Sequence, residues 1–384
     1  MSEIDRITQI KDRAGTGAPN FTFGVNFAGS DSGINPHTHT EGANEPSSPN
    51  NGDTWWDSDN DIYKVYMDNA WKDWLGTTAA AFTWGGDRGI FAGGYSGGFK
   101  NEIDYVNITS AGNASDFGNL TDARNGVSGT ASTTRSVFAM GWNGSVYSNV
   151  LDYITTASTG NATDFGDYSV AMSNSARGVT SNGTTGLFQG GWPNSGSARS
   201  NVIHKITIAT PGNSTDFGDL TVARMIAGAA GDATRGLLSS GSATVGGSNS
   251  NSNVIDYTTI ATPGNATDFG DGTIVRTELS GASDATRSLF LGGHGDGAAS
   301  ERVTIDYVTT QTAGNATDFG DLTGQRFDGS SNSNGTKALN VGYFNGSVSN
   351  VIDQVTIQTA GNATDFGDLT VARNGLAATS GAAS

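Results

Sequence analysis

Cysteine is absent from the 384 residues of the chain, which excludes disulfide bonds and thiolate chemistry. Basic residues are scarce, since 20 lysines and arginines stand against 37 aspartates and glutamates, and the net charge is −17. A nucleic-acid-binding protein needs a basic surface, so no nucleic-acid partner is expected. The sequence also lacks a run of about 18 apolar residues and, at its start, the apolar core of a signal peptide. We therefore expect a soluble chain that is made in the cytoplasm and does not insert into a membrane.

Proline is also rare, with 7 residues, whereas glycine is very frequent, with 56. Serine, threonine, asparagine and aspartate are plentiful, and apolar residues occur in short β-branched and aromatic runs. This composition is typical of many short strands joined by tight turns, and it argues against both helices and disorder. The sequence therefore predicts an all-β protein.

One heptapeptide, Gly-Asn-x-x-Asp-Phe-Gly, occurs six times with small variations. Its copies begin at Gly112, Gly160, Gly212, Gly264, Gly314 and Gly361. A spacing of about 50 residues indicates an array in which one supersecondary unit is repeated. Length alone would suggest two or three domains, so the repeat changes the expected organisation from about residue 78 onward.

The unit that contains the fifth copy predicts four short strands. Residues 287–293 form an apolar run that ends in two glycines, and residues 303–308 are β-branched and aromatic. Phe319 anchors a third strand, and a weaker strand is expected around 328–333. Four short strands in about 50 residues are typical of one blade of a β-propeller.

These motifs resemble the kelch repeat of β-propellers. Three of the six units have a strand that ends in Gly-Gly, three have an Ile-Asp-Tyr strand, and three have a Leu-Thr-x-Ala-Arg segment, which ends at Arg373 in the sixth unit. The aromatic anchor is a phenylalanine such as Phe117, where kelch repeats usually have tryptophan. The resemblance implies a six-bladed kelch-like β-propeller with four short strands per blade.

Two segments, one at each end of the repeat region, align with the same strand position. Residues 79–83 and 375–379 both align with the innermost strand of a blade. We favour the C-terminal segment as the strand that completes the first blade, because joining the two chain ends in one blade removes free strand edges.

The N-terminal part contains no repeat. Residues 46–53 are rich in turn-forming residues, and a three-stranded meander is predicted for the segments 54–57, 62–66 and 70–74. The pattern Pro-x-x-Gly-Asp-x-Trp-x-Asp, followed by Tyr-x-Val-Tyr and Trp, resembles a small module common in bacteriophage tail-fibre proteins and in some carbohydrate-active enzymes. The expected domains are an N-terminal attachment arm (1–45), a small tryptophan-rich β module (46–77) and the propeller (78–384).

Two histidines precede this module. His37 and His39 are two residues apart, so in a strand both side chains would point to one side. The pattern is similar to a His-x-His of trimeric phage fibres and spikes, in which three chains supply six imidazoles to an axial metal. The resemblance implies a homotrimer with Fe, Zn or Ni at His37 and His39, since these metals suit imidazole. The alternative is a polar loop with two histidines by chance.

An aspartate recurs in one strand of five units, at Asp104, Asp152, Asp256, Asp306 and Asp353. Paired carboxylates serve in glycoside hydrolysis. Because these residues recur in nearly every unit, we expect them instead to cap turns or to pair with an arginine of a neighbouring strand. The copper-radical oxidases that share the kelch fold need a Cys–Tyr crosslink, which this chain cannot form. We nominate no catalytic residue and expect no enzyme.

The heptapeptide also carries an aspartate in every copy, which offers oxygen ligands for calcium. The spacing matches no calcium-binding loop. We therefore expect the asparagines and aspartates of the heptapeptide to cap turns.

The most informative variation lies five residues after the first apolar residue of each unit. The residues there are Tyr95, Trp142, Trp192, Ser242, His294 and Phe344. We expect them at equivalent places at one end of the propeller, followed by variable loops, where rigid scaffolds usually carry binding residues. The candidate ligand-binding residues are Tyr95, Trp142, Trp192, His294 and Phe344, since aromatic rings with polar neighbours suit sugar stacking. The alternative is that these rings wedge between blades.

Together the resemblances imply a bacteriophage virion appendage of the tail-fibre, receptor-binding type. Residues 1–40, with Ile4, Ile7 and Ile10 among charged residues, would attach to other virion proteins. The propeller loops would bind a host-surface polysaccharide or receptor. Two alternatives are a structural or decorating virion protein of the head, neck or tail without host binding and, less favoured, an enzyme that acts on polysaccharide.

Overall fold

The computed structural model describes residues 39–42, 44–50, 52–57, 62–67, 70–73, 86–173, 179–193, 198–245, 248–295 and 302–382. All regular elements in these residues are β-strands, which confirms the all-β prediction. The described residues contain no helix long and apolar enough to cross a membrane. The chain divides into two compact units, residues 1–81 and 82–384.

The first unit contains one four-stranded sheet in the order β1-β2-β3-β4. Its strands are β1 (His39–Gly42), β2 (Thr54–Asp57), β3 (Ile62–Met67) and β4 (Ala70–Asp73). The last three form the antiparallel meander that the sequence predicts. The sheet extends beyond the expected module, because β1 pairs in parallel with β2. His39 therefore lies in a strand, whereas His37 lies outside the described residues.

Aromatic side chains pack this small sheet. Trp55 is buried, and its indole Nε1 donates a hydrogen bond to the carbonyl of Gly42 at 2.9 Å. The rings of Trp55 and Trp71 meet edge to face with centroids 5.7 Å apart, and Tyr66 contacts Trp71 at 5.4 Å. The indole thus supplies both apolar area and the polar contact that holds β1 against the meander.

The described residues of the second unit form six sheets whose main strands are antiparallel. Sheet 1 consists of β30 (Ala377–Gly381), β5 (Arg88–Tyr95), β6 (Phe99–Asn107) and β7 (Ser115–Asn119). Sheet 2 consists of β8 (Ser128–Ala131), β9 (Arg135–Ala139), β10 (Val150–Thr155) and β11 (Thr163–Asp167). Sheet 3 consists of β13 (Val179–Ser181), β14 (Thr185–Pro193), β15 (Ser200–Thr207) and β16 (Thr215–Asp219), with β12 (Met172–Ser173) beside β14.

The other three sheets follow the same order. Sheet 4 consists of β18 (Gly228–Gly231), β19 (Arg235–Val245), β20 (Ser248–Thr259) and β21 (Thr267–Arg276), with β17 (Arg224–Met225) beside β19. Sheet 5 consists of β22 (Ser280–Ser283), β23 (Arg287–Leu291), β24 (Arg302–Thr309) and β25 (Thr317–Arg326). Sheet 6 consists of β26 (Ser330–Ser333), β27 (Lys337–Val341), β28 (Val351–Thr356) and β29 (Thr364–Asp368).

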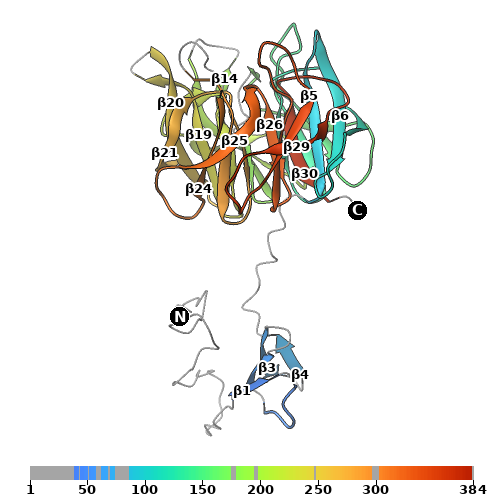
Figure 1. The fold of residues 1–384 in the computed structure, drawn as a ribbon, viewed down its shortest axis with the longest axis vertical. Coiled ribbons are helices and arrows are strands. Elements are labelled where there is room, and N and C mark those ends of the chain that lie inside the picture. The colour runs from blue at the N-terminus through green and yellow to red at the C-terminus, as the bar shows by residue number, and fades with distance from the viewer. Residues whose placement is uncertain are drawn as a thin grey trace. The chain divides into compact units, whose positions relative to one another are not determined.

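Sheet 1 is built from both ends of the second unit. The C-terminal strand β30 pairs antiparallel with β5, with Ala377 opposite Ala92 and Gly381 opposite Arg88. In Figure 1 the red β30 therefore lies beside the cyan β5. Residues 79–83, the other segment that aligns with this position, lie outside the described residues.

Six clusters of buried apolar side chains lie between consecutive sheets, including one between sheets 6 and 1. The first strand of each sheet also contacts the first strands of the sheets before and after it, and β30 contacts both β26 and β8. Both faces of a sheet are therefore covered. This explains why the second strand of sheet 2 has the continuous apolar run Val137, Phe138 and Ala139, whose side chains are all fully buried.

The heptapeptide joins each sheet to the preceding one. Phe117 is buried in the cluster between sheets 1 and 2, and its carbonyl accepts a hydrogen bond from Gly160 at the start of the next copy. Ala162 donates to the carbonyl of Asn119, while the side-chain oxygen of Asn161 accepts from the Asn119 amide. The asparagine bond recurs at all six junctions, including that from Asn113 to sheet 6.

This geometry corrects the expectation that the asparagine caps its own turn, because its oxygen serves the neighbouring sheet. The backbone amide that donates this bond belongs to the outermost strand of its sheet. Without the bond this strand would expose an unpaired edge, which favours aggregation. The close approach needs glycine. Gly118 has φ 148°, and a Cβ there would collide with the backbone of Gly160.

Candidate ligand-binding site

The six variable positions are structurally equivalent, as predicted. Five units end in an arginine, which we call the exit arginine, and the second unit has Met172 in its place. The exit arginines are Arg124, Arg224, Arg276, Arg326 and Arg373. Each variable residue pairs antiparallel with the residue that follows the exit arginine, or Met172, of the preceding unit. The pairs are Tyr95 with Asn374, Trp142 with Asn125, Trp192 with Ser173, Ser242 with Met225, His294 with Thr277, and Phe344 with Phe327. They share one end of the six sheets, which we call the loop end.

The loop end is opposite the end at which the chain enters and leaves the second unit. Strand β5 runs from Arg88, which pairs with Gly381, to Tyr95 at the loop end. The backbone of Gly86 lies directly against that of Gly381, and the Ala382 amide bonds to Thr133. Both chain ends of the described sheets thus lie away from the variable loops.

Four aromatic residues gather at the loop end of sheets 1 and 2, and we call them the aromatic patch. Tyr95 and Phe99 meet edge to face with ring centroids 5.4 Å apart, and Trp142 and Tyr147 are tilted at 4.7 Å. Tyr95 is 38% exposed, and the other three side chains are half-buried. The two hairpins meet where Phe99 covers Gly144. A Cβ added at Gly144 would lie 2.6 Å from the Phe99 ring.

Polar groups border the aromatic patch. The Asn143 amide donates to the carboxylate of Asp122 at 3.0 Å, and its oxygen accepts from the backbone of the hairpin. Both side chains are half-buried, so hydrogen-bonding groups lie beside Trp142.

The remaining candidates lie elsewhere. His294 and Phe344 both pack edge to face on Phe327, at 5.1 and 5.6 Å, so these two rings fit the alternative of wedges between sheets 5 and 6. Trp192 is 39% exposed at sheet 3. At the fourth variable position, Ser242 accepts a hydrogen bond from Arg199 at 2.5 Å.

Three aromatic residues at the loop end were not predicted from the sequence, namely Phe99, Tyr147 and Phe327. Phe99 and Tyr147 lie in the variable loops just beyond Tyr95 and Trp142, so an aromatic residue in the same hairpin was an available signal. Phe327 follows the exit arginine Arg326, and only the antiparallel pairing with Phe344 reveals its place at the loop end.

The recurring aspartates form buried ion pairs, as expected, with the arginine that leaves the preceding unit. The pairs are Arg124 with Asp152 (2.8 Å), Arg224 with Asp256 (2.5 Å), Arg276 with Asp306, Arg326 with Asp353 (2.7 Å) and Arg373 with Asp104 (3.1 Å). Each side chain is at most 1% exposed. Burial lowers the pKa of Arg276, and the Asp306 carboxylate opposes that shift. A threonine hydroxyl also donates to each aspartate, so these carboxylates are structural.

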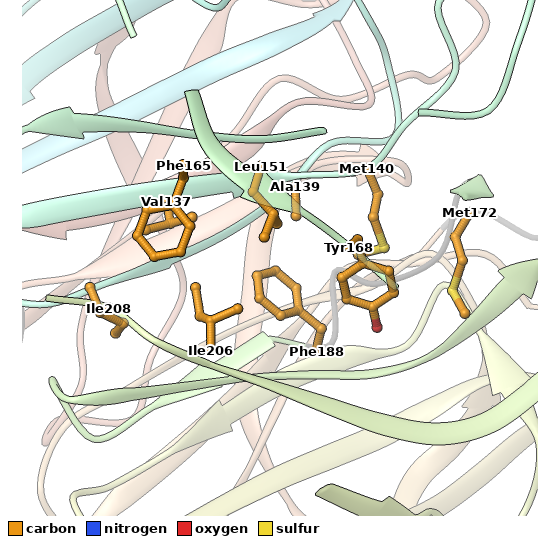
Figure 2. Close-up of a cluster of buried hydrophobic side chains, with 10 residues drawn as sticks. All are labelled: Val137, Ala139, Met140, Leu151, Phe165, Tyr168, Met172, Phe188, Ile206 and Ile208. Carbon is orange, nitrogen blue, oxygen red and sulfur yellow. The ribbon is translucent and has the colours of Figure 1, made fainter. Parts of the chain in front are cut away.

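At the junction between sheets 2 and 3, which we call junction 2/3, the described residues form no such ion pair. Met172 replaces the arginine and His204 the aspartate. Tyr168 packs on His204 at 4.6 Å and on Phe188 at 5.6 Å, and Ser169 bonds to His204 at 3.1 Å. Figure 2 shows Tyr168, Phe188 and Met172 within this apolar cluster. Burial raises the pKa of Tyr168 and lowers that of His204, against an opposing effect of Asp216.

A cavity of about 110 Å³ lies between the first strands of all six sheets. Its described lining is glycine, alanine, valine, serine, threonine and asparagine, without a charged side chain. Serine hydroxyls bridge neighbouring strands there, as Ser333 does to the carbonyl of Ser283. Typical ligand pockets measure about 300 to 1,000 Å³, so this cavity suits water molecules better than a sugar.

The described residues contain no group of three or more His, Cys, Asp or Glu side chains placed to hold a metal ion. His37, which is predicted to bind a metal together with His39, lies outside the described residues. Compared with known protein families and with curated proteins, the chain shows no match. Its function therefore has to be inferred from its own residues.

Proposed function

We propose that the six sheets are the blades of a closed, kelch-like, six-bladed β-propeller. The apolar clusters between consecutive sheets support this proposal, since one of them joins sheets 6 and 1. The heptapeptide bonds at all six junctions and the pairing of β30 with β5 support closure by the C-terminal strand.

We further propose that the chain is a bacteriophage virion appendage of the receptor-binding type, which binds a host-surface glycan or protein. The observation that carries this proposal is the exposed aromatic patch at the loop end, opposite the end where the chain enters the sheets. A tethered binding domain needs this polarity, because its binding face must point away from its attachment. The resemblance of residues 46–77 to a tail-fibre module supports the same function.

In this proposal residues 1–40 attach to other virion proteins. A homotrimer with a metal at His37 and His39 stays a prediction, and metal analysis of the purified full-length protein together with its mass in solution tests it. No reaction is assigned, because the recurring carboxylates are engaged in buried ion pairs.

The experiment that tests the function uses the labelled full-length protein and cells of the bacteria to which the phage adsorbs. We expect the protein to bind these cells and to compete with phage adsorption. Absence of binding and of competition would contradict the proposal and favour a structural or decorating virion protein. Shortening of the host polysaccharide would instead indicate an enzyme.

A further inference from the structure

The aromatic patch is a single surface made by two sheets. Its two ring pairs come from the β5–β6 hairpin of sheet 1 and from the hairpin after β9 in sheet 2. Phe99 of the first hairpin lies on Gly144 of the second, which places the two hairpins in contact. Neither hairpin alone provides the whole surface.

Backbone hydrogen bonds hold both hairpins in place. The Tyr95 amide donates to the Asn374 carbonyl at 2.8 Å, and the Trp142 amide donates to Asn125 at 2.8 Å. In the second hairpin, Ser148 donates to Gly141 at 2.8 Å. A surface that is ordered before binding loses less conformational freedom when a ligand arrives, which favours affinity.

The chemistry of the patch selects its ligand. The exposed Tyr95 ring and the half-buried Trp142 ring offer apolar surface to the C–H face of a pyranose, while Asn143 and Asp122 offer partners to its hydroxyls. The carboxylate of Asp122 borders the patch, and the whole chain has a net charge of −17. Uronic or sialic acids would therefore be repelled, whereas neutral sugars would not.

We propose that the aromatic patch binds neutral pyranose units of a host-surface polysaccharide. This inference rests on the proposed function and adds the ligand class and the residues that contact it. The sugar rings stack on Tyr95 and Trp142, and Phe99 and Tyr147 support these two rings. Trp192, His294 and Phe344 are outside the contact.

Two glycines give a matched test that removes no aromatic ring. Gly144 and Gly346 occupy equivalent hairpins with φ 97° and 103°, so alanine strains the backbone equally at both. An added Cβ meets Phe99 at position 144 and has nothing within 4 Å at position 346. Gly144→Ala therefore displaces the patch, whereas Gly346→Ala is the control for backbone strain.

The experiment measures binding of the full-length protein to an array of neutral and acidic oligosaccharides. We expect retention of neutral saccharides only, a loss of about tenfold or more in affinity for Tyr95→Ala and for Trp142→Ala, and a smaller loss for Gly144→Ala. Gly346→Ala and Phe344→Ala should bind as the unchanged protein does. Circular dichroism of each variant verifies that it is folded.

The outcomes separate this inference from the function on which it rests. Binding to host cells without retention of any neutral saccharide, or binding that survives Tyr95→Ala and Trp142→Ala, overturns the inference and leaves the receptor-binding function intact. Cell binding abolished by protease treatment of the cells indicates a protein receptor and also overturns it. Absence of cell binding contradicts the proposed function itself.

Discussion

Junction 2/3 differs from the other five junctions of the second unit in the residues that occupy the positions of the buried arginine and aspartate. The five contain a buried Arg–Asp pair, whereas junction 2/3 has Met172 and His204 at the two positions. Both charges are replaced together, and Tyr168 packs beside the histidine. Breaking a buried pair costs about 3 to 5 kcal/mol, while replacing both partners with well-packed groups is often neutral. We therefore expect the residues of one junction to act as one unit.

The largest effect is expected from removing one partner of an ion pair. Asp306→Ala leaves Arg276 fully buried without its carboxylate, so the free energy of unfolding should fall by about 3 to 5 kcal/mol. Urea denaturation followed by fluorescence measures this change. Asp318 lies opposite Asp306 on the next strand but is exposed, so Asp318→Ala is the control and should change stability by no more than about 0.5 kcal/mol. Equal losses for the two variants would refute the structural role of the pair.

A smaller loss of stability is expected when junction 1/2, which lies between sheets 1 and 2, is given the residues of junction 2/3. The triple variant Leu120→Tyr, Arg124→Met, Asp152→His removes both charges and adds the ring that fills the space. We expect a loss of about 1 to 2 kcal/mol, from imperfect packing alone. Asp152→His alone should lose more, because Arg124 stays buried. If the triple variant is the less stable of the two, the two kinds of junction are not interchangeable.

Acid should weaken junction 2/3 through its histidine. Burial lowers the pKa of His204 below its usual 6.5, so the unfolded chain takes up a proton at a higher pH than the folded chain. The stability that His204 contributes is therefore present above about pH 6.5 and is lost as the pH falls through its folded pKa. Unfolding curves between pH 7.5 and 5 should show a shallower decline for His204→Gln. An unchanged slope would contradict this assignment.

The smallest effect is expected in a feature that all junctions share. Asn213→Ala at junction 2/3 and Asn161→Ala at junction 1/2 each remove one hydrogen bond to the preceding sheet, of 2.9 and 3.1 Å. Each should cost about 0.5 to 1.5 kcal/mol. Equal thermal shifts would show that this bond is independent of the ion pair. A much larger loss at junction 2/3 would show that the asparagine compensates there for the missing pair.

Much of the second unit could be predicted from the sequence because its repeats supply six copies of each local pattern. The strands, the equivalence of Tyr95 and Trp142, and the pairing of the recurring aspartates with arginine all depend on register within a repeat. The contact of Phe99 with Gly144 and the cross-sheet bond of Asn161 depend on how one sheet packs on the next. No local periodicity encodes such packing, so only the structure revealed them.

The candidate site shows the same division. The sequence places five aromatic candidates at one end of the sheets, yet only Tyr95 and Trp142 belong to the aromatic patch. His294 and Phe344 are drawn together by Phe327, a residue of the connection between sheets that has no aromatic equivalent in the other units. Residues that differ between repeats thus determine the surface, and residues that recur hold the sheets together.

The most direct test of the junction as a unit is a double-mutant cycle that builds an ion pair at junction 2/3. Met172→Arg alone and His204→Asp alone each bury an unpaired charge, and we expect each to lower the free energy of unfolding by about 3 kcal/mol or more. The account predicts that the double variant recovers most of this loss, with a favourable coupling energy of about 2 kcal/mol or more. Additive losses, with no coupling between the two positions, would contradict it.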